Sequence, residues 1–453
     1  MNSRKTIDIS ALIDASKISS FQIWLLILVG MTVVTDGFDV LAMAFTAPAI
    51  IQEWGINKAA LGAVFGAGLF GMLVGSLTFS VLADKIGRRP VLIWCSVFFG
   101  VCTLITAQVT TIPELIAIRF IAGLGLGAIM PNAMALAGEF SPKRSRVTLM
   151  MYVSCGFTLG SVLGGLLASA MIPAWGWQSV FYLGGVIPLV IATLMFFYVP
   201  ESLQFMAMKG VKPEILAASL RKIDPTIHID ADTRYVLSEP GKSGTPMLEL
   251  FHGGRAKATL LLWVVNFMNL LDLYFLSSWI PTIAKSAGMT LQNSVLLGTS
   301  LFVGGLIGTL VMGPLIDRIG FYKVLVPAFA VAAVSTALIG QLGGSLPLLF
   351  AAVTVTGACI IGGQPGLNAL AATYYPTALR STGIGWSLGI GRFGSIVGPV
   401  VGGLLIGLNW STSAIFIAIA VTAMISAVTL LLMGLETRGK AMKPFGEAAS
   451  MSH

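Results

Sequence analysis

Twelve long apolar runs constrain this chain more than any other feature of its sequence. Each run is long enough to cross the roughly 30 Å hydrocarbon core of a bilayer as a helix that rises about 1.5 Å per residue. The first six cover residues 21–51, 59–83, 90–109, 112–140, 147–172 and 179–199. The second six cover residues 258–284, 293–316, 324–342, 346–374, 381–408 and 411–435. This pattern predicts an all-α membrane protein with twelve transmembrane helices.

The composition supports a membrane location. Hydrophobic residues make up 56% of the 453 residues and charged residues only 10%, whereas a soluble domain carries about 25% charged residues. So little charge excludes a soluble enzyme, a nucleic-acid binder and a disordered chain. The four cysteines all lie in apolar runs without metal-ligand or redox spacing. We therefore expect no disulfide framework, no metal site and no cofactor.

A polar stretch separates the two groups of apolar runs. It divides the chain into an N-terminal six-helix bundle (1–199), a cytoplasmic linker (200–255) and a C-terminal six-helix bundle with a tail (256–453). The linker is expected to hold short amphipathic helices, of which residues 213–223 are the better candidate. Two groups of six spans predict two bundles of equal size.

The distribution of lysine and arginine predicts the orientation in the membrane. With the N-terminus inside, 23 of the 27 Lys and Arg residues fall in cytoplasmic segments. Positive residues are enriched in cytoplasmic loops, so we expect both termini in the cytoplasm. The net charge of +8 then reflects topology, and no nucleic-acid partner is needed to explain it.

The loop after the second span is repeated after the eighth. The first copy contains Asp84-Lys85-Ile-Gly87-Arg88, and the second contains Asp317-Arg318-Ile-Gly320. Each glycine allows a tight turn, and each aspartate can cap a helix or bind an arginine. A matched pair at the same place in both halves indicates a duplicated bundle. We therefore predict two pseudo-symmetric halves.

This repeated loop resembles the signature loop of the major facilitator superfamily, with Ser80 in place of its usual glycine. The resemblance covers essentially the whole chain and implies a transporter that works by alternating access. The charged segments 139–146 and 200–202 look like those of sugar-porter-like members. The resemblance implies a cytoplasmic gate built from Asp84, Arg88, Glu139, Arg146, Asp317 and Arg380, together with Glu201. Independent surface charges are the alternative for Glu201 and Lys143.

Few ionisable residues lie inside the predicted spans. They are Asp36, Asp39, Arg119, Asp272 and Arg392, with Glu139 at the inner end of a span. Each is costly in hydrocarbon and needs a partner or a cavity. Asp36 and Asp39 are spaced i, i+3 and so share one helical face, where mutual repulsion favours reversible protonation of one of them. We predict that this pair couples transport to protons. In the alternative, one aspartate pairs with an arginine while the other caps a helix break at Gly37.

The two intramembrane arginines allow two interpretations. A guanidinium in a span either neutralises an aspartate or binds an anionic substrate through its planar fork. With Arg119 and Arg392 facing Asp36 and Asp39, protonation of one carboxylate leaves a net positive charge that suits an organic carboxylate. The three histidines lie outside the spans, so a histidine proton relay is not expected.

Three segments sharpen the resemblance. They are Asp36-Gly-Phe-Asp39, the glycine-rich run 123–132 that ends in Pro131-Asn132, and the segment 374–392. Together they resemble the aromatic acid:proton symporter family, whose members import benzoate, 4-hydroxybenzoate, protocatechuate, gentisate and related ring acids into bacteria. The resemblance assigns functional roles to Asp36, Asp39, Asp84, Arg119, Glu139, Asp317, Arg380 and Arg392.

Asp272 is not part of the family pattern. Three interpretations are open for it: a partner for a ring hydroxyl, another proton site, or a hydrogen-bond partner of Asn269, which is the simplest. The candidate substrate-binding residues are Arg119, Arg392, Asn269, Asp272, Gln364, Asn368 and Trp386. Buried amides suit ring hydroxyls. Phe38, Phe267, Tyr274 and Trp386 either stack on a ring or serve as packing.

The chain is therefore predicted to be no enzyme but a proton-coupled symporter that imports a benzoate or hydroxybenzoate across the bacterial inner membrane, functional as a monomer. Its expected partners are a small aromatic carboxylate, protons and the lipid bilayer. The alternatives are a drug or other organic-anion transporter of the same fold, and a sensor that binds aromatic acids without transporting them.

Overall fold

The computed structural model describes residues 6–16, 18–142, 144–209, 213–223, 234–236, 247–252, 255–375 and 379–441. In this part of the chain, twelve helices are long and apolar enough to cross a membrane. Each predicted run overlaps one of these helices, with differences of a few residues at the ends. The prediction of a helical membrane region with twelve spans is therefore confirmed.

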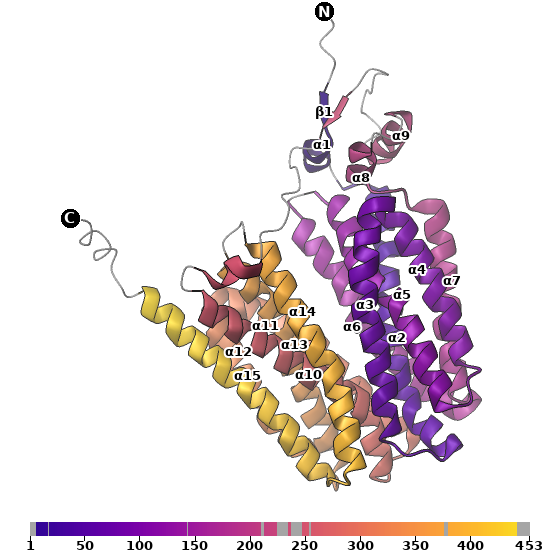
Figure 1. Ribbon diagram of the computed structural model, residues 1–453, viewed down its shortest axis with the longest axis vertical. Coiled ribbons are helices and arrows are strands. Elements are labelled where there is room, and N and C mark those ends of the chain that lie inside the picture. Colours follow the sequence, from indigo (N-terminus) through magenta and orange to yellow (C-terminus); the bar gives the residue numbers. More distant parts are fainter. Residues whose placement is uncertain are drawn as a thin grey trace, which may run out of the picture. The chain divides into compact units, whose positions relative to one another are not determined.

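Residue contacts divide the chain into two compact units, Met1–Lys242 with Ile280–Thr299, and Ser243–Trp279 with Ser300–His453. The long helices of the first unit are α2 (Ser20–Trp54), α3 (Ala60–Ile86), α4 (Arg88–Thr106), α5 (Ile112–Glu139), α6 (Arg146–Trp175) and α7 (Gln178–Tyr198). Helix α2 packs on α5, α6 and α7, and α5 also packs on α3 and α4 (Figure 1).

The second unit begins with the short 3-10 helix η1 (Met247–Phe251). Its long helices are α10 (Ala256–Ser286), α11 (Leu291–Ile319), α12 (Phe321–Ile339), α13 (Leu346–Tyr374), α14 (Arg380–Gly407) and α15 (Thr412–Ala441). Helix α12 packs on α13 and α15, and α13 packs on α14. Residues 280–299, which join α10 to α11, belong to the first unit.

Local sequence signals set the helix boundaries. Ser19 and Gln22 form a reciprocal capping box at the start of α2, which satisfies backbone N–H groups that lack helical partners. The repeated loops turn at Gly87 and Gly320, whose φ values are +109° and +91°. Side chains with a Cβ rarely adopt such backbone angles. The predicted tight turns at the two glycines are therefore confirmed.

Five short elements accompany the first unit. They are β1 (Thr6–Asp8), α1 (Ile9–Ala15), α8 (Leu203–Met208), α9 (Pro213–Ile223) and β2 (Arg234–Val236). Helix α9 matches the amphipathic helix predicted for residues 213–223. Strands β1 and β2 pair in parallel, with Thr6 opposite Arg234. These strands depart from the all-α prediction, because three residues are too few for a period-two pattern to be recognised.

The two units repeat the same close helix contacts. In the first unit, a Cβ on Gly75 of α3 would collide with the backbone of Leu124 in α5. In the second, a Cβ on Gly308 of α11 would collide with the backbone of Ala358 in α13. Small residues allow such backbone approach in membrane bundles. The contact between the second and fourth spans is therefore conserved between the halves.

The contact between the first and fifth spans is repeated as well. A Cβ on Gly160 of α6 would meet the backbone of Val34 in α2, and one on Gly394 of α14 would meet Phe267 in α10. These contacts fix the register between the halves. Counting along each helix gives these corresponding positions: Asp36 and Asn269, Asp39 and Asp272, Asp84 and Asp317, Arg88 and Phe321, Arg119 and Val353, and Glu139 and Thr373.

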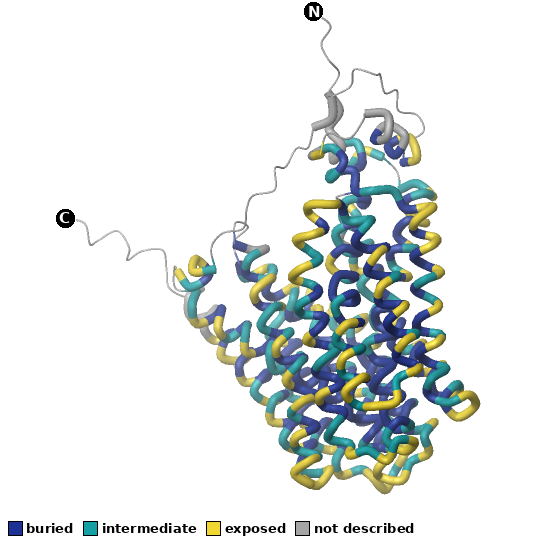
Figure 2. Tube along the Cα trace, turned by 45° about the vertical axis from the view of Figure 1, so that its right-hand side comes forward, coloured by how far each residue is buried: buried dark blue, intermediate teal, exposed yellow. Residues whose placement is uncertain are grey.

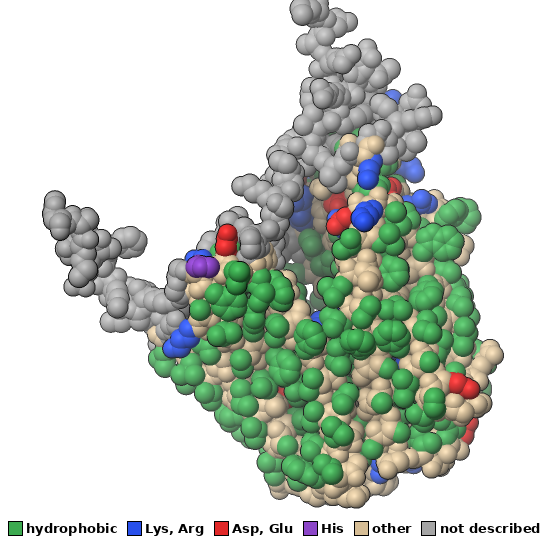
Figure 3. Space-filling model, viewed as in Figure 1, with side chains coloured by type: hydrophobic (Ala, Val, Ile, Leu, Met, Phe, Trp, Pro, Cys, Tyr) green, Lys and Arg blue, Asp and Glu red, His purple; other side chains and the backbone are tan. Residues whose placement is uncertain are grey.

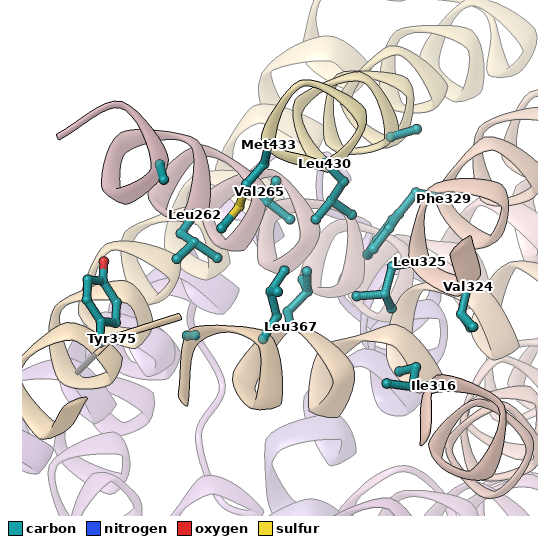
Figure 4. Packing of buried hydrophobic residues seen from close by; sticks show 14 of the residues in the cluster. Leu262, Val265, Ile316, Val324, Leu325, Phe329, Leu367, Tyr375, Leu430 and Met433 are labelled. Carbon is teal, nitrogen blue, oxygen red and sulfur yellow. The ribbon is translucent and has the colours of Figure 1, made fainter. Parts of the chain in front are cut away.

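Buried apolar side chains hold the helices of each unit together. In the second unit, Leu262 and Val265 of α10, Leu367 of α13 and Leu430 of α15 belong to one buried cluster (Figure 4). Buried and exposed positions alternate along the long helices (Figure 2), as expected when one face meets other helices. Hydrophobic side chains cover most of the visible surface of the helices, and most visible charged side chains lie near helix ends (Figure 3). This surface suits contact with lipid.

Candidate functional site

Asp39 is the centre of a buried polar cluster in the first unit. Its side chain lies on α2 and has no exposed surface. The Arg119 guanidinium on α5 donates to both carboxylate oxygens, at 2.9 Å from Nη2 to Oδ2 and 3.4 Å from Nη1 to Oδ1. The Thr103 hydroxyl on α4 donates to Oδ1 at 2.8 Å. Asp39 is thus held by an ion pair and a hydroxyl from two neighbouring helices.

Arg119 is fully committed to this cluster. It is 4% exposed, and a third hydrogen bond of 3.3 Å runs from Nη2 to the Asp39 carbonyl oxygen. Its Cζ lies 6.0 Å from the centre of the Phe181 ring on α7, which is within cation–π range. Of the two roles open to this arginine, neutralising an aspartate is the one that its geometry serves.

Asp36 lies one helical turn before Asp39 and is also buried, at 2% exposure. Helix α2 continues without interruption through Gly37, so neither aspartate caps a break there. Gly37 instead allows the backbone of Phe157 in α6 to come close. The structure therefore supports only half of the alternative interpretation, namely the pairing of one aspartate with Arg119.

A network of amides occupies the second unit between α10 and α13. Asn269 Nδ2 donates to Gln364 Oε1 at 2.6 Å. Gln364 Nε2 in turn donates to Asn266 Oδ1 and to Asn368 Oδ1, both at 3.1 Å. Asn266 also donates to the Ser387 hydroxyl of α14 at 2.8 Å. The predicted residues Asn269, Gln364 and Asn368 are thus brought together.

Three members of this network have polar groups that could bind a further partner. Gln364 and Asn368 are half-buried, so solutes can reach part of each side chain. Asn269 Oδ1 is buried and accepts no hydrogen bond from any described residue. A buried acceptor without a donor is costly, and a ligand hydroxyl is one group that would satisfy it.

Arg392 lies on α14, which packs through Gly391 and Gly394 against α10. Its side chain is half-buried. Among the described residues no carboxylate lies within ion-pair distance of its guanidinium, since the three ion pairs found there involve Arg88 and Arg119. Unlike Arg119, Arg392 therefore has no carboxylate partner in this part of the chain.

Asp272 on α10 has no exposed surface. Its Oδ1 accepts a hydrogen bond from the Thr422 hydroxyl of α15. Its Oδ2 is buried and has no hydrogen-bond partner among the described residues. The expected bond to Asn269 is not formed, because the Asn269 amide is directed toward Ile360 and Gln364 on α13.

Trp386 does not join the amide network. Its ring stacks on that of Trp263, with ring centres 6.1 Å apart and planes inclined by 27°. Trp263 also meets Phe251 of η1 edge to face. Trp386 is 41% exposed, so part of its surface remains open, but its packing partner in the second unit is another tryptophan.

The loop between α3 and α4 carries a charged network. Arg88 binds Asp84 and Glu139, each at 3.1 Å. Glu139 also accepts a hydrogen bond from the Ser202 hydroxyl. Three of the predicted gate residues, Asp84, Arg88 and Glu139, are thus brought together at the end of the first unit from which α8 continues.

Other predicted gate residues are placed differently. Glu201 forms no ion pair within the described residues but accepts the backbone N–H groups of Arg88 and Arg89 at 3.0 and 3.2 Å. It therefore caps the N-terminus of α4, where a negative charge is favoured. Arg146 donates to the Ser141 carbonyl oxygen at 3.3 Å and binds no carboxylate there.

The second half has fewer charged contacts at the corresponding loop. Asp317 is exposed, and the three ion pairs among the described residues do not include it. Arg380 begins α14, but its side chain lies outside the described residues. The equivalents of Arg88 and Glu139 are Phe321 and Thr373, so the Arg88 network has no copy here.

Comparison with known sequences identifies the family. The sequence profile of the Major Facilitator Superfamily matches residues 27–220 and 262–450. The chain belongs to the Major Facilitator Superfamily. The twelve-span fold and the repeated loop are those expected of this superfamily.

Individual relatives indicate which group of the superfamily this chain is similar to. The chain is 37% identical to the 4-hydroxybenzoate transporter PcaK of Pseudomonas aeruginosa over 96% of this chain and 97% of that protein. It is 36% identical to a gallate transporter of Pseudomonas putida over 94% and 95%, and 32% identical to a benzoate transport protein of Acinetobacter baylyi over 95% and 93%. The resemblance to aromatic acid transporters is thereby confirmed, as is the prediction that the chain is no enzyme.

Solved structures support the fold. A bacterial homologue of the human lysosomal transporter Spinster, in an inward-facing and occupied conformation, superposes with a TM-score of 0.73. The match covers 92% of this chain and 97% of that one at 14% identity. At this identity the likeness supports the major facilitator fold alone.

Sequence reasoning missed several members of these clusters. Thr103 and Thr422 donate hydrogen bonds to the predicted residues Asp39 and Asp272. Asn266 accepts one from the predicted residue Gln364 and donates one to the Ser387 hydroxyl. Asn266 lies one turn before Asn269 on the same face of α10, and that spacing was a usable signal. The hydroxyl residues carry no such signal, since serine and threonine in spans commonly bond to their own helix backbone.

Proposed function

We propose that this protein imports an aromatic carboxylate of the benzoate or hydroxybenzoate class together with protons, by alternating access across the bacterial inner membrane. The single observation that carries the proposal is the contrast between the two intramembrane arginines. Arg119 is bound to a buried aspartate, whereas Arg392 has no carboxylate within reach among the described residues. One arginine serves proton coupling and the other serves anion binding.

Asp39 is the proposed proton-coupling residue, with Asp36 beside it. While Asp39 is ionised, Arg119 holds it through two hydrogen bonds. Protonation removes the negative charge and weakens this bidentate pair. The helices α2 and α5 that carry the pair are then free to change their contact, which links proton binding to the conformational cycle.

Arg392 is the proposed anchor for the substrate carboxylate. A guanidinium matches a carboxylate through two parallel hydrogen bonds. The network of Asn266, Asn269, Gln364 and Asn368 lies on α10 and α13, which both pack on α14. Its unsatisfied acceptor and half-buried amides suit a ring hydroxyl. Relatives named for 4-hydroxybenzoate and gallate support a hydroxylated ring acid as substrate.

The remaining roles follow the same scheme. Asp84, Arg88 and Glu139 form a gate at the cytoplasmic end of the first half, and Asp317 belongs to its counterpart in the second. We propose both termini in the cytoplasm on the basis of the lysine and arginine distribution. The two six-helix halves, 1–199 and 256–453, are the moving bodies, joined by the linker 200–255 in a functional monomer.

Transport by purified protein in proteoliposomes tests this function. With an inward proton gradient, labelled 4-hydroxybenzoate should accumulate, and a proton uncoupler should abolish the accumulation. Asp39→Asn should abolish proton-driven accumulation and retain counterflow of labelled against unlabelled substrate. Thr103→Val is the matched control, because it removes a hydrogen bond from Asp39 and leaves its carboxylate in place.

Two results would contradict the proposal. One is uptake that requires sodium and ignores the uncoupler. The other is the absence of counterflow for benzoate, 4-hydroxybenzoate, protocatechuate and gentisate alike, which would favour a sensor or a transporter of another substrate class.

A further inference from the structure

The register between the two halves places Asp272 at the position of Asp39. Gly160 of α6 packs on Val34, five residues before Asp39, and Gly394 of α14 packs on Phe267, five residues before Asp272. Both aspartates have no exposed surface. The second half thus carries a buried carboxylate at the site where the first half carries its proposed proton-coupling residue.

The partners of the two carboxylates differ. Arg119, which neutralises Asp39, corresponds to Val353 in α13. Asp272 receives one hydrogen bond from the Thr422 hydroxyl, and its other oxygen has no partner among the described residues. The second half therefore keeps the acid and lacks the cation.

Among the described residues, no cation forms an ion pair with Asp272. Helix α13 contains no Asp, Glu, Lys, Arg or His. Helix α14 contains Arg380 as its first residue and Arg392, which forms no ion pair in the described part of the chain. The ionisable residues of α15 lie near its C-terminal end at 436–440. An ionised carboxylate without a cation is expensive in a membrane interior. Binding a proton removes that charge.

A second buried acceptor lies on the same face of α10. Asn269 Oδ1, one turn before Asp272, also lacks a hydrogen-bond donor among the described residues. Two acceptors at i, i+3 share one helical face. A proton on Asp272 would add a hydrogen-bond donor to the face of α10 that carries these two unsatisfied acceptor atoms, Asn269 Oδ1 and Asp272 Oδ2.

The balance of charges in the spans also favours a proton on Asp272. Apart from Glu114 and Glu139 at the two ends of the fourth span, the spans hold three aspartates, Asp36, Asp39 and Asp272, and two arginines, Arg119 and Arg392. One proton on the Asp36–Asp39 pair makes their summed charge zero, so a bound monoanion would leave one net negative charge in the membrane. A further proton on Asp272 makes the loaded protein neutral across its spans.

We propose that Asp272 binds a second proton in each transport cycle. This inference rests on the proposed function and deepens it. Two protons taken from the outer water, one on the Asp36–Asp39 pair and one on Asp272, then enter with one ring-acid monoanion and are released inside. Each cycle moves one net positive charge inward, so the membrane potential drives uptake.

The test is accumulation of labelled 4-hydroxybenzoate in proteoliposomes with equal pH on both sides and an inside-negative potential set by potassium and valinomycin. One net charge per cycle allows about 50-fold accumulation at 100 mV. The unmodified protein should accumulate substrate toward that limit. Asp272→Asn should show no potential-driven accumulation and should still accumulate substrate when an inward proton gradient is applied. Asp272→Glu, which retains an acid, should restore the response to potential.

The outcomes separate this inference from the proposed function. If the unmodified protein accumulates substrate with a proton gradient but ignores the potential, Asp272 holds its proton permanently and the inference is wrong. It is equally wrong if Asp272→Asn responds to potential like the unmodified protein, or if Asp272→Asn loses counterflow and Asp272→Glu fails to restore it. If the unmodified protein shows neither proton-driven uptake nor counterflow, the proposed function itself fails.

Discussion

Asp39 in the first half and Asp272 in the second occupy corresponding positions on corresponding helices, yet their surroundings differ. Asp39 is bound by a guanidinium and a hydroxyl, whereas the described residues give Asp272 one hydroxyl donor and no cation. The glycine contacts that position both helices are the same in each half. The scaffold has therefore been kept while the charges placed on it have diverged.

The loops after the second and eighth spans show the same divergence. Both turn at a glycine with positive φ and carry an aspartate three residues earlier. In the first half Arg88 ties that aspartate to Glu139, whereas Phe321 and Thr373 stand at the corresponding positions in the second. The two halves thus share the backbone turn at this loop. The side chains that differ between them give each half its own polar contacts.

The largest expected effect comes from removing the cation that distinguishes Asp39. Arg119→Leu leaves a buried aspartate without its partner, which typically costs about 3–5 kcal/mol. We expect a large fall in the denaturation temperature of the detergent-solubilised protein. Asp39→Asn combined with Arg119→Leu should recover part of the loss, because no uncompensated charge remains. A single Arg119→Leu variant as stable as the unmodified protein would show that the ion pair does not support the first half.

The next effect concerns Arg392, which has no carboxylate partner among the described residues. Arg392→Gln removes the proposed carboxylate anchor, and a hydrogen bond to a charged group is worth about 1.5–3 kcal/mol. The dissociation constant for 4-hydroxybenzoate, measured by calorimetry, should therefore rise by about 10- to 150-fold, with little change in stability. Arg318→Gln, in the exposed last turn of α11 in the same half, is the matched control and should bind normally. Unchanged binding by Arg392→Gln would place the anion site elsewhere.

A smaller effect is expected at the charged loop. Arg88→Gln breaks the contacts to Asp84 and Glu139 together, and a loss of about 1.4 kcal/mol in one conformation corresponds to a tenfold change in its population. Initial uptake should slow by about tenfold while the dissociation constant stays within about twofold, since a gate biases conformations. Asp84→Asn should slow uptake less, because Asp84 is mostly exposed. If Phe321→Ala in the other half slows uptake as much as Arg88→Gln, the ion pairs are not what distinguishes the two loops.

Much of the fold follows from the sequence, because each span must satisfy its backbone hydrogen bonds within itself. The twelve runs, the helix 213–223 and the turns at Gly87 and Gly320 all depend on local signals. The strand pairing of Thr6 with Arg234 was not predicted, since it joins segments more than two hundred residues apart. Local pattern carries no information about which distant segment meets a three-residue strand.

The sequence predicts which residues belong to the site better than it predicts which of them bond to each other. Intramembrane charges stand out in any apolar sequence, so Asp39, Arg119, Asp272 and Arg392 were found at once. Which aspartate meets Arg119, and that Asp272 bonds to Thr422 rather than to Asn269, depends on helix rotation. A rotation of one residue, about 100°, changes every partner, and only the packed glycine contacts fix it.

The smallest expected effect comes from removing the hydroxyl that donates a hydrogen bond to Asp39 or to Asp272. Thr103→Val and Thr422→Val each remove one hydroxyl donor, from Asp39 and from Asp272 respectively. Such a bond contributes about 0.5–1.5 kcal/mol net. Asp39 keeps its bonds to Arg119, so Thr103→Val should lower the denaturation temperature only slightly. Asp272 has no other hydrogen-bond donor among the described residues, so Thr422→Val should lower the denaturation temperature more, although both changes remove the same chemical group.

Measuring both variants in one detergent removes the contribution that the threonine-to-valine replacement makes by itself. Equal losses would mean that Asp272 finds another partner once Thr422 is gone, and a larger loss for Thr103→Val would mean that the Asp39 ion pair depends on its hydroxyl for its geometry.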